Sequence, residues 1–309
     1  MATRSVNRTG SGGVSVREVI LFANSNAGKG RGRKLADTLA LRLQAGGLVT
    51  RVILDSPQTA GLAEGKADAA IVIGGDGTVR QVAKAMLSVN TPPPPMLLVP
   101  AGTANVMGKH LGIDWRDADL AERVLESLRQ GRVRQFDVGS ANGEPFLVMA
   151  GVGIDAHIVH EAHRARKGPI TYGHFVWPAA RTLLCYPYRP IEVHLDGKLV
   201  FAPVPAVAFI GNISEYGTRF PVLPGARPDD GLLDLCVIPV KSPADSIRQF
   251  LLSAAGEHIL DEGVVYARGT EIRVDSPDPV PVQIDGDPAG FTPVVFSLLP
   301  RRLAFIVPA

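Results

Sequence analysis

The chain has 309 residues, 46% of them hydrophobic and 20% charged, and its formal net charge is +2 at pH 7. This length and composition predict two globular domains with sizeable cores rather than one small domain or a disordered chain. The near-neutral charge gives no case for binding nucleic acid, and no apolar stretch is long enough to cross a bilayer as a helix.

The N-terminal residues 1–13 are polar and glycine-rich and lack the apolar core of a signal peptide, so we expect a disordered tail there. From Val16 to about Phe136, short apolar runs alternate with helical patterns, which indicates a parallel sheet covered by helices. We expect strands near 18–23, 49–54, 69–73 and 96–99, and helices near 31–46, 78–89 and 117–130.

A glycine-rich basic loop over residues 24–32 follows the first strand and precedes the first helix. The order strand, loop, helix directs the N–H groups at a helix N-terminus toward a phosphate. Lys29 and Arg31 add positive charge, although the spacing is not that of a Walker loop. The alternative is a flexible basic loop with no ligand.

A second loop, Gly74-Gly75-Asp76-Gly77-Thr78, ends the apolar run at 71–73. Successive N–H groups in such a turn form a nest for anionic oxygens, and glycine lets a ligand approach closely. Asp76 places a carboxylate beside the expected phosphates, which suits a bound divalent cation or a transferable proton. The same residues also make an ordinary turn after a strand.

A third loop, Pro100-Ala101-Gly102-Thr103-Ala104-Asn105, follows the strand near 96–99. Ligands of open parallel sheets bind at the carboxyl ends of the strands, where these three loops are expected to meet. Together they predict a site for a nucleotide and a metal ion.

After Asp137 the pattern changes to apolar runs separated by turns, which indicates an antiparallel β-rich domain. The expected strands are near 145–149, 191–195, 204–210, 232–238, 264–266, 271–274, 280–284 and 294–298. Segment 155–184 is expected to be helical, and we interpret its three histidines, His157, His160 and His163, as part of a solvated basic helix rather than a metal site. A further helix is expected over 243–255, with Ser242 as its cap and Pro243 in its first turn.

The loops at 74–78 and 100–105 resemble those of the diacylglycerol kinase catalytic family, which includes bacterial lipid kinases and is related to sphingosine kinases. Weaker matches lie at 136–139, 151–155, 211–212, 229–234 and 284–287. The resemblance implies a Rossmann-like α/β domain over 14–138, a β-sandwich-type lipid-binding domain over 139–290 as in NAD kinase, and an active site in the cleft between them. It also implies that residues 291–309 return to the first domain.

The same resemblance implies an ATP-dependent lipid kinase that uses Mg²⁺ to phosphorylate diacylglycerol or a similar lipid alcohol. The implied nucleotide-binding residues are Asn24, Gly28, Lys29, Gly30, Gly74, Gly75, Asp76, Gly77, Thr78, Gln81, Gly102, Thr103 and Asn105. The implied metal-binding residues are Asp76 and Asp137, and, around a structural ion, Asp230 with the carbonyl groups of Arg227 and Leu232. A plain turn is an equal alternative for this last group.

The general base is implied to come from Asp285-Gly286-Asp287, which corresponds to Asp-Gly-Glu in the family, and either aspartate could take the proton. A tight hairpin turn is the alternative interpretation. Other departures are Ser25 for proline, Gln81 for glutamate and Val106 for an aspartate of the metal network. We therefore expect weaker Mg²⁺ binding, or the use of a neighbouring carboxylate.

Two other functions stay open. NAD kinases also carry Gly-Gly-Asp-Gly-Thr, but the Asn-Glu pair that follows it in them is missing here. The other alternative is a catalytically silent nucleotide or lipid sensor, which would tolerate the departures.

Cys185 and Cys236 have no metal or redox spacing, which fits the reducing cytoplasm. We expect reversible attachment to the inner face of the membrane, through Arg164, Arg166 and Lys167, and leave homodimer formation open.

Overall fold

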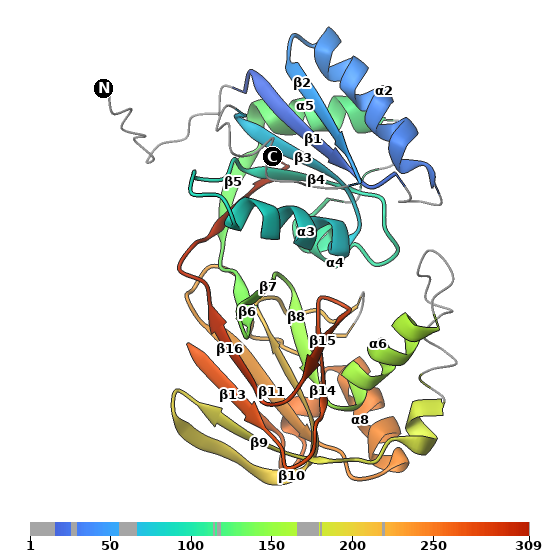
Figure 1. The fold of residues 1–309 in the computed structure, drawn as a ribbon, viewed down its shortest axis with the longest axis vertical. Helices are drawn as coiled ribbons and strands as arrows, with labels where there is room; N and C mark the ends of the chain where they lie inside the picture. Colours follow the sequence, from blue (N-terminus) through green and yellow to red (C-terminus); the bar gives the residue numbers. More distant parts are fainter. Residues whose placement is uncertain are drawn as a thin grey trace.

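The computed structural model describes residues 16–25, 30–55, 67–113, 115, 119–165, 179, 181–217 and 220–308. They form an α/β domain stacked on a β-rich domain (Figure 1). The disordered tail expected over residues 1–13 lies outside the described residues.

The first domain is built on a six-stranded sheet in the order β2-β1-β3-β4-β17-β5. The pairs among β1 to β4 are parallel, as is β17 with β4, whereas β5 runs antiparallel to β17. The four predicted strands are confirmed. The bounds are β1 Glu18–Ala23, β2 Val49–Leu54, β3 Ala69–Gly74, β4 Met96–Pro100, β5 Arg132–Phe136 and β17 Leu303–Val307.

Helices cover this sheet because each places an apolar stripe against it. α3 buries Val79, Val82, Ala83 and Met86, which recur at helical spacing. In Figure 1, α3 and α4 lie between the sheet and the second domain. The helices are α2 Gly32–Ala45, α3 Asp76–Leu87, α4 Val106–His110 and α5 Leu120–Gln130.

The second domain is antiparallel, as expected, and one long strand connects its two layers. The first part of β10 pairs with β9, and its last part pairs with β8 and β11. Its register shifts between Leu199 and Val204, where Pro203 interrupts the ladder because proline has no N–H to donate. The bend lets both layers enclose one apolar core, which includes Phe146, Ile210 and Phe296.

The strands of this domain differ from the expectation at several points. β6 was not expected, and β10 begins at Lys198, before the expected start near 204. The run expected over 145–149 is two strands, β7 and β8, and the segment after Asp285 forms β15, which was not expected. The bounds are β6 Gly139–Ala141, β7 Glu144–Phe146, β8 Met149–Val152, β9 Pro190–Leu195, β10 Lys198–Gly211, β11 Leu233–Pro239, β12 Val265–Gly269, β13 Glu271–Asp275, β14 Pro281–Ile284, β15 Asp287–Phe291 and β16 Val294–Leu298.

The helices of the second domain are α6 Ile154–Arg164, α8 Pro243–Ala255 and the short η3 His258–Leu260. α8 begins as predicted, because the Ser242 hydroxyl accepts a hydrogen bond from Asp245 N at 3.1 Å. The expectation of a solvated helix is wrong for His160, which is buried with its Nε2 2.8 Å from Val282 O. Arg166 and Lys167 lie outside the described residues. Among the described residues, no helix has the length and apolar character needed to cross a membrane.

The two domains are joined by side chains as well as by the chain itself. Of residues 291–309, β16 lies in the second sheet and β17 in the first. Between these strands, Arg301 donates hydrogen bonds of 2.6–3.0 Å to the carbonyl groups of Leu87, Val89 and Thr91, just after α3. Lys84 Nζ on α3 also lies 2.6 Å from the Glu144 carboxylate on β7.

We predict that Phe305→Ala lowers the free energy of unfolding by about 3–5 kcal/mol, because it leaves a cavity in the apolar core of the first domain. Phe305 is fully buried, and its ring packs edge-on against Phe136 with 5.0 Å between centroids. Chemical denaturation followed by circular dichroism measures the change. The control Leu41→Ala, at a side chain 68% exposed, should change stability by less than about 0.5 kcal/mol. Equal effects of the two variants would contradict the prediction.

Candidate active site

The second and third loops touch through their backbones. A Cβ added at Gly102 would lie 2.4 Å from the Gly75 Cα, closer than real side chains allow. Gly74 likewise leaves room for the Thr78 side chain, which would lie 2.5 Å from an added Cβ. Glycine is therefore required at position 102 by the contact between the two loops, and at position 74 by the folding of the second loop onto its own Thr78.

Asn105 closes the third loop. It has left-handed backbone angles, with φ 49°, which asparagine tolerates better than most residues. Its Oδ1 accepts a hydrogen bond from Gly102 N and its Nδ2 donates one to Gly102 O, both at 2.9 Å. The side chain predicted to bind nucleotide thus also holds the loop in shape.

Asp76 connects the same two loops. Its carboxylate oxygens accept hydrogen bonds of 3.0 Å from Val106 N and Met107 N, at the start of α4. A carboxylate at this position satisfies helix N–H groups that have no partner within the helix. Asp76 is therefore held at the carboxyl end of the sheet, with one lone pair of each oxygen already used.

A pocket opens at the ends of β1 and β2. Three of the residues predicted to bind nucleotide line it, Asn24, Thr78 and Gln81. Gly30 begins the approach to α2 with φ +88°, whereas Gly28 and Lys29 lie outside the described residues. The other lining residues are Phe22, Ala23, Ile53, Asp55 and Val82.

Asp55 was not predicted. Its carboxylate accepts a hydrogen bond from Ser25 N at 2.6 Å, and the contacts with Ser25 lower its pKa. The sequence could have indicated Asp55, because it directly follows the second predicted strand, at the same edge of the sheet as the three loops.

Asp285 and Asp287 lie in a tight hairpin between β14 and β15. Asp285 and Gly286 both have positive φ, 49° and 83°, and Ile284 pairs with Asp287, as in a two-residue type I′ turn. The hairpin interpretation is therefore correct for the backbone. It does not exclude a chemical role, because the two carboxylates have different surroundings.

The Asp285 carboxylate is enclosed by backbone donors. Leu147 N, Val148 N and Met149 N donate to it at 2.8, 2.9 and 3.1 Å. Burial raises the pKa of Asp285 to about 6, although these hydrogen bonds act in the opposite direction. Its oxygens are engaged in holding the hairpin against β7 and β8.

Asp287, in contrast, faces the first domain. Its carboxylate forms an ion pair with Arg80 on α3, and its Oδ2 is 3.9 Å from the position of a Cβ added at Gly77. The side chain remains 31% exposed. The hairpin of the second domain thus reaches the Gly-Gly-Asp-Gly-Thr loop of the first.

Two family models match the chain. Residues 18–141 match the diacylglycerol kinase catalytic domain, and residues 148–307, more than half of the chain, match the YegS C-terminal NAD kinase beta sandwich-like domain. The chain belongs to the diacylglycerol kinase catalytic-domain family. This kinase therefore acts on a lipid, and the family favours that interpretation over an NAD kinase.

Individual relatives agree with the family. A diacylglycerol kinase of Bacillus subtilis (strain 168) is 26% identical over 248 residues, 78% of each chain. A probable lipid kinase YegS-like of Pseudomonas aeruginosa (strain UCBPP-PA14) is 29% identical over 242 residues, 76% of this chain and 75% of that protein. A solved diacylglycerol kinase structure from Bacillus anthracis str. Sterne has the same fold, with a TM-score of 0.70, 22% identity and coverage of 95% and 97% of the two chains.

A network of hydrogen bonds among polar side chains holds the β14–β15 hairpin of the kinase in place. Gly286 N donates to Gln283 Oε1 at 2.9 Å, Gln283 Nε2 donates to Asp155 Oδ2 at 3.1 Å, and Tyr216 OH donates to Asp155 Oδ1 at 2.5 Å. A Cβ at Gly151 would lie 2.3 Å from Asp155 Oδ2, so glycine makes room for the network. Burial raises the pKa of Asp155 to about 6.

Asp137 and Asp76 are not in contact. Phe136 pairs with Leu303, and Phe305 pairs with Met96, so Asp137 lies near the amino end of β4, opposite the edge that carries Asp76. The Asp137 carboxylate is bound by Arg302 and by Gly231 N instead. Asp76 and Asp137 thus lie at opposite edges of the sheet, and a metal role for Asp137 stays a prediction.

The carboxylate predicted to hold a structural metal ion is already paired with protein groups. The Asp230 carboxylate forms an ion pair with Arg268 and accepts a hydrogen bond from Leu232 N at 3.1 Å. Arg268 also pairs with the fully buried Asp234, at 3.4 Å. The guanidinium group of Arg268 therefore supplies positive charge where a metal ion was expected. Arg227 lies in the same segment, and its role stays a prediction.

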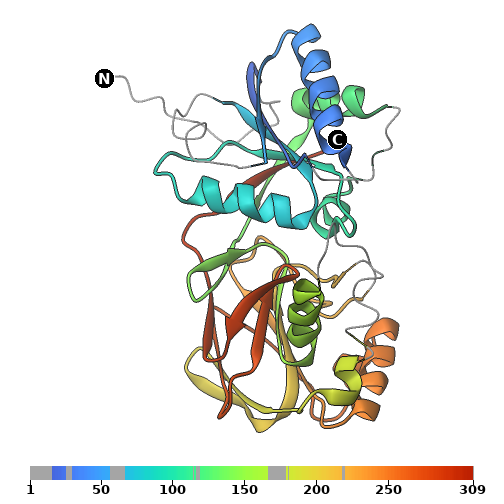
Figure 2. The same cartoon turned by 45° about the vertical axis from the view of Figure 1, so that its right-hand side comes forward.

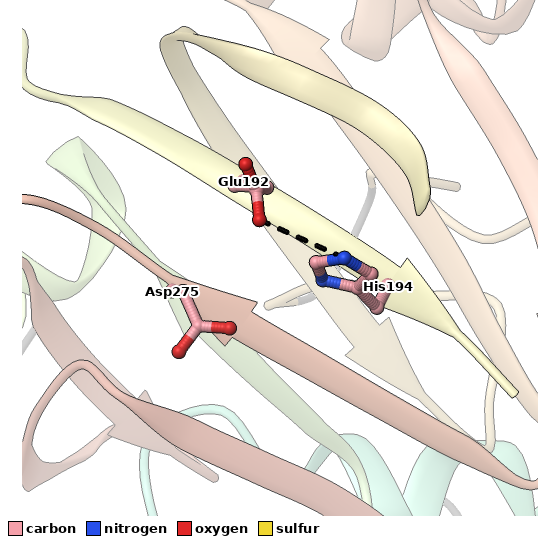
Figure 3. A group of neighbouring side chains, drawn as sticks. All are labelled: Glu192, His194 and Asp275. Carbon is pink, nitrogen blue, oxygen red and sulfur yellow. Dashed lines mark ion pairs between the residues drawn. The ribbon is translucent and has the colours of Figure 1, made fainter. Parts of the chain in front are cut away.

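A different group of potential metal ligands lies on the second domain. Glu192 and His194 are neighbours on one face of β9, and Asp275 stands opposite on β13 (Figure 3). His194 Nε2 is 3.6 Å from Glu192 Oε1, but Arg273 donates two hydrogen bonds of 2.7 and 3.1 Å to Asp275. Because Arg273 balances the Asp275 carboxylate, we assign no cation to this group.

We predict that chelation leaves the denaturation midpoint of the kinase unchanged, because Arg268 supplies the charge beside Asp230. Arg268→Ala should lower the free energy of unfolding by about 1–3 kcal/mol, because the buried Asp234 loses a charged partner. Thermal melts with EDTA and with excess Mg²⁺ measure both effects. Arg273→Ala, which removes an exposed ion pair, is the control and should cost less than about 1 kcal/mol. A midpoint that falls in EDTA in the wild type and falls equally in Asp76→Ala would contradict the prediction.

Asp155 makes stability depend on pH. Its folded-state pKa of about 6 is above the ordinary value of 3.8, so the folded chain binds this proton more tightly than the unfolded chain. Its contribution to stability is complete below pH 3.8 and is lost as pH rises through 6. We predict that Asp155→Asn flattens the fall in stability between pH 4.5 and 7, measured by denaturant titration.

Asp261→Asn is the matched control for this titration. Hydrogen bonds from Arg248 and Gln249 lower the pKa of Asp261 to about 2, so its contribution is lost only at more acidic pH. That variant should keep the wild-type slope between pH 4.5 and 7. The same slope in Asp155→Asn and the wild type would refute the assignment.

Proposed function

We propose that this kinase transfers the γ-phosphoryl group of ATP to a hydroxyl of diacylglycerol or a similar membrane lipid alcohol. One observation carries the proposal: the Asp287 carboxylate of the second domain lies over the Gly77 loop of the first, beside Arg80. Phosphoryl transfer needs phosphates held in place, neutralised charge and a base near the acceptor hydroxyl. The loops and the hairpin offer these groups at one edge of the sheet.

Asp287 is the better candidate for the base. It is half-buried and reachable, whereas three backbone N–H groups occupy the Asp285 carboxylate. In this mechanism Asp287 accepts the proton of the lipid hydroxyl as the oxygen attacks the γ-phosphorus, and the bond from the γ-phosphorus to the bridging oxygen breaks to release ADP. Arg80 orients Asp287 in the free enzyme and then faces the developing negative charge on the transferred group.

The nucleotide phosphates would lie against the second loop and the N-terminus of α3. The helix begins at Asp76, so its first N–H groups and the positive end of its dipole face this loop. Asn24, Thr78 and Gln81 line the adjoining pocket, and in this proposal they contact the rest of the nucleotide.

Mg²⁺ fits this site through Asp76. The Asp76 oxygens each accept one N–H group and keep a lone pair that can bind Mg²⁺ or one of its waters. When bound, the ion would neutralise phosphate charge. The absence of an aspartate at Val106 leaves Asp76 as the main carboxylate for this contact, in line with weaker Mg²⁺ binding.

We predict that Asp287→Asn lowers kcat by about 10²–10⁴-fold with little change in the KM for ATP, because it removes proton transfer and keeps the shape of the side chain. Asp76→Ala should also abolish turnover. Labelled ATP with detergent-dispersed diacylglycerol measures transfer. Asp278→Asn, at an exposed turn, is the control and should keep wild-type activity.

Near-normal turnover of Asp287→Asn would refute the assigned base. Nucleotide binding by the wild type without label in any lipid would instead support the sensor interpretation, and label on NAD would support an NAD kinase.

A further inference from the structure

The surface helix α8 buries polar side chains and exposes apolar ones. Its two buried side chains are polar, Gln249 and Ser253. Three large apolar side chains face solvent: Ile247 is 52%, Phe250 59% and Leu251 61% exposed. The remaining exposed positions of the helix are Pro243, Ala244, Arg248, Ala254 and Ala255, so Arg248 is the one charged residue on the outer face.

The inward face is fixed by polar contacts, so the orientation of α8 is specified by the fold. Gln249 Nε2 donates to Asp261 Oδ2 at 2.5 Å, and the hydroxyl groups of Ser246 and Tyr188 are 3.1 Å apart. Arg248 forms a bidentate ion pair with Asp261, which neutralises its charge. A soluble surface helix normally shows the reverse arrangement, with its apolar stripe inward.

Neighbouring segments extend the exposed apolar surface. Leu260 in η3 is 82% exposed, and Leu184, in the helical residues 181–185, is 80% exposed. Figure 2 shows α6, residues 181–185 and α8 on the same flank of the second domain. We call this surface the α8 apolar face: Leu184, Ile247, Phe250, Leu251 and Leu260.

The α8 apolar face lies on the same side as the hairpin that carries Asp287. α6 packs against that hairpin, where His160 stacks edge-on with Phe291 at 5.4 Å between centroids. Phe291 is the last residue of β15 and is 49% exposed. Exposed apolar side chains therefore flank α6 on both sides, next to the element that holds the candidate base.

We propose that the α8 apolar face inserts into the interfacial region of a lipid bilayer. This inference rests on the proposed function, because a lipid alcohol with long chains is presented by a bilayer. The contact is driven by apolar burial rather than by charge, since Asp261 neutralises Arg248.

A bilayer fits this surface better than a second copy of the chain. A helix of this length offers a footprint about 20 Å long and about 10 Å wide. A stable protein interface takes about 800 Å² from each partner, whereas one amphipathic helix face is enough to bind a bilayer interface.

The test uses the full chain and sedimentation with sucrose-loaded phosphatidylcholine vesicles. The variant Ile247→Ser/Phe250→Ser/Leu251→Ser should bind these vesicles at least about tenfold more weakly than the wild type. The control Leu41→Ser/Leu199→Ser removes apolar side chains that are 68% and 54% exposed elsewhere, and should bind like the wild type. Raising the salt concentration should leave wild-type binding unchanged.

Activity separates this inference from the proposed function. The triple variant should phosphorylate a short-chain, water-soluble diacylglycerol at the wild-type rate and lose activity toward long-chain diacylglycerol in vesicles. No transfer by the wild type to either substrate would refute the proposed function, while sedimentation still decides the membrane contact.

Three results would overturn the inference. One is equal vesicle binding by the triple variant and the wild type. Another is wild-type binding that needs anionic lipid and disappears at high salt. The third is a change from dimer to monomer in the triple variant, seen by light scattering, without any change in vesicle binding.

Discussion

The contact between the β14–β15 hairpin and helix α3 is the interaction on which the site depends. Each domain carries only part of the chemistry: the first holds the glycine loops, and the second holds the reachable carboxylate. The ion pair between Arg80 and Asp287 brings them together. Lys84 with Glu144, and Arg301 with the carbonyl groups after α3, hold the same two surfaces in place. The geometry of the site is thus a property of the interface between domains.

Much of the fold could be predicted because burial leaves a direct trace in the pattern of residues. The run at 69–73 is apolar on both faces and ends in glycine, as a central parallel strand should. The N-cap of α8 could also be predicted, from Ser242 and Pro243. β15 could not be predicted, because Asp287-Pro-Ala-Gly-Phe does not alternate apolar and polar residues and becomes a strand only by pairing with β14.

The site was predictable as a set of loops but not as a set of contacts. Arg80 and Asp287 are 207 positions apart, and no local pattern announces their pairing. The different surroundings of Asp285 and Asp287 depend on backbone donors from β7 and β8, which no spacing reveals. The pairing of Asp137 with Arg302 and of Asp230 with Arg268 could not be predicted either, because each arginine comes from a distant segment.

The place of β17 has a consequence for biosynthesis. β17 lies between β4 and β5, so the sheet of the first domain is completed by a segment that is translated after the strands of the second domain. Until they leave the ribosome, β5 has no strand beside it and β4 presents an open edge. The first domain therefore cannot complete its sheet before the second domain has been synthesised, and a nascent chain that stalls after residue 290 would be left with an unfinished first domain.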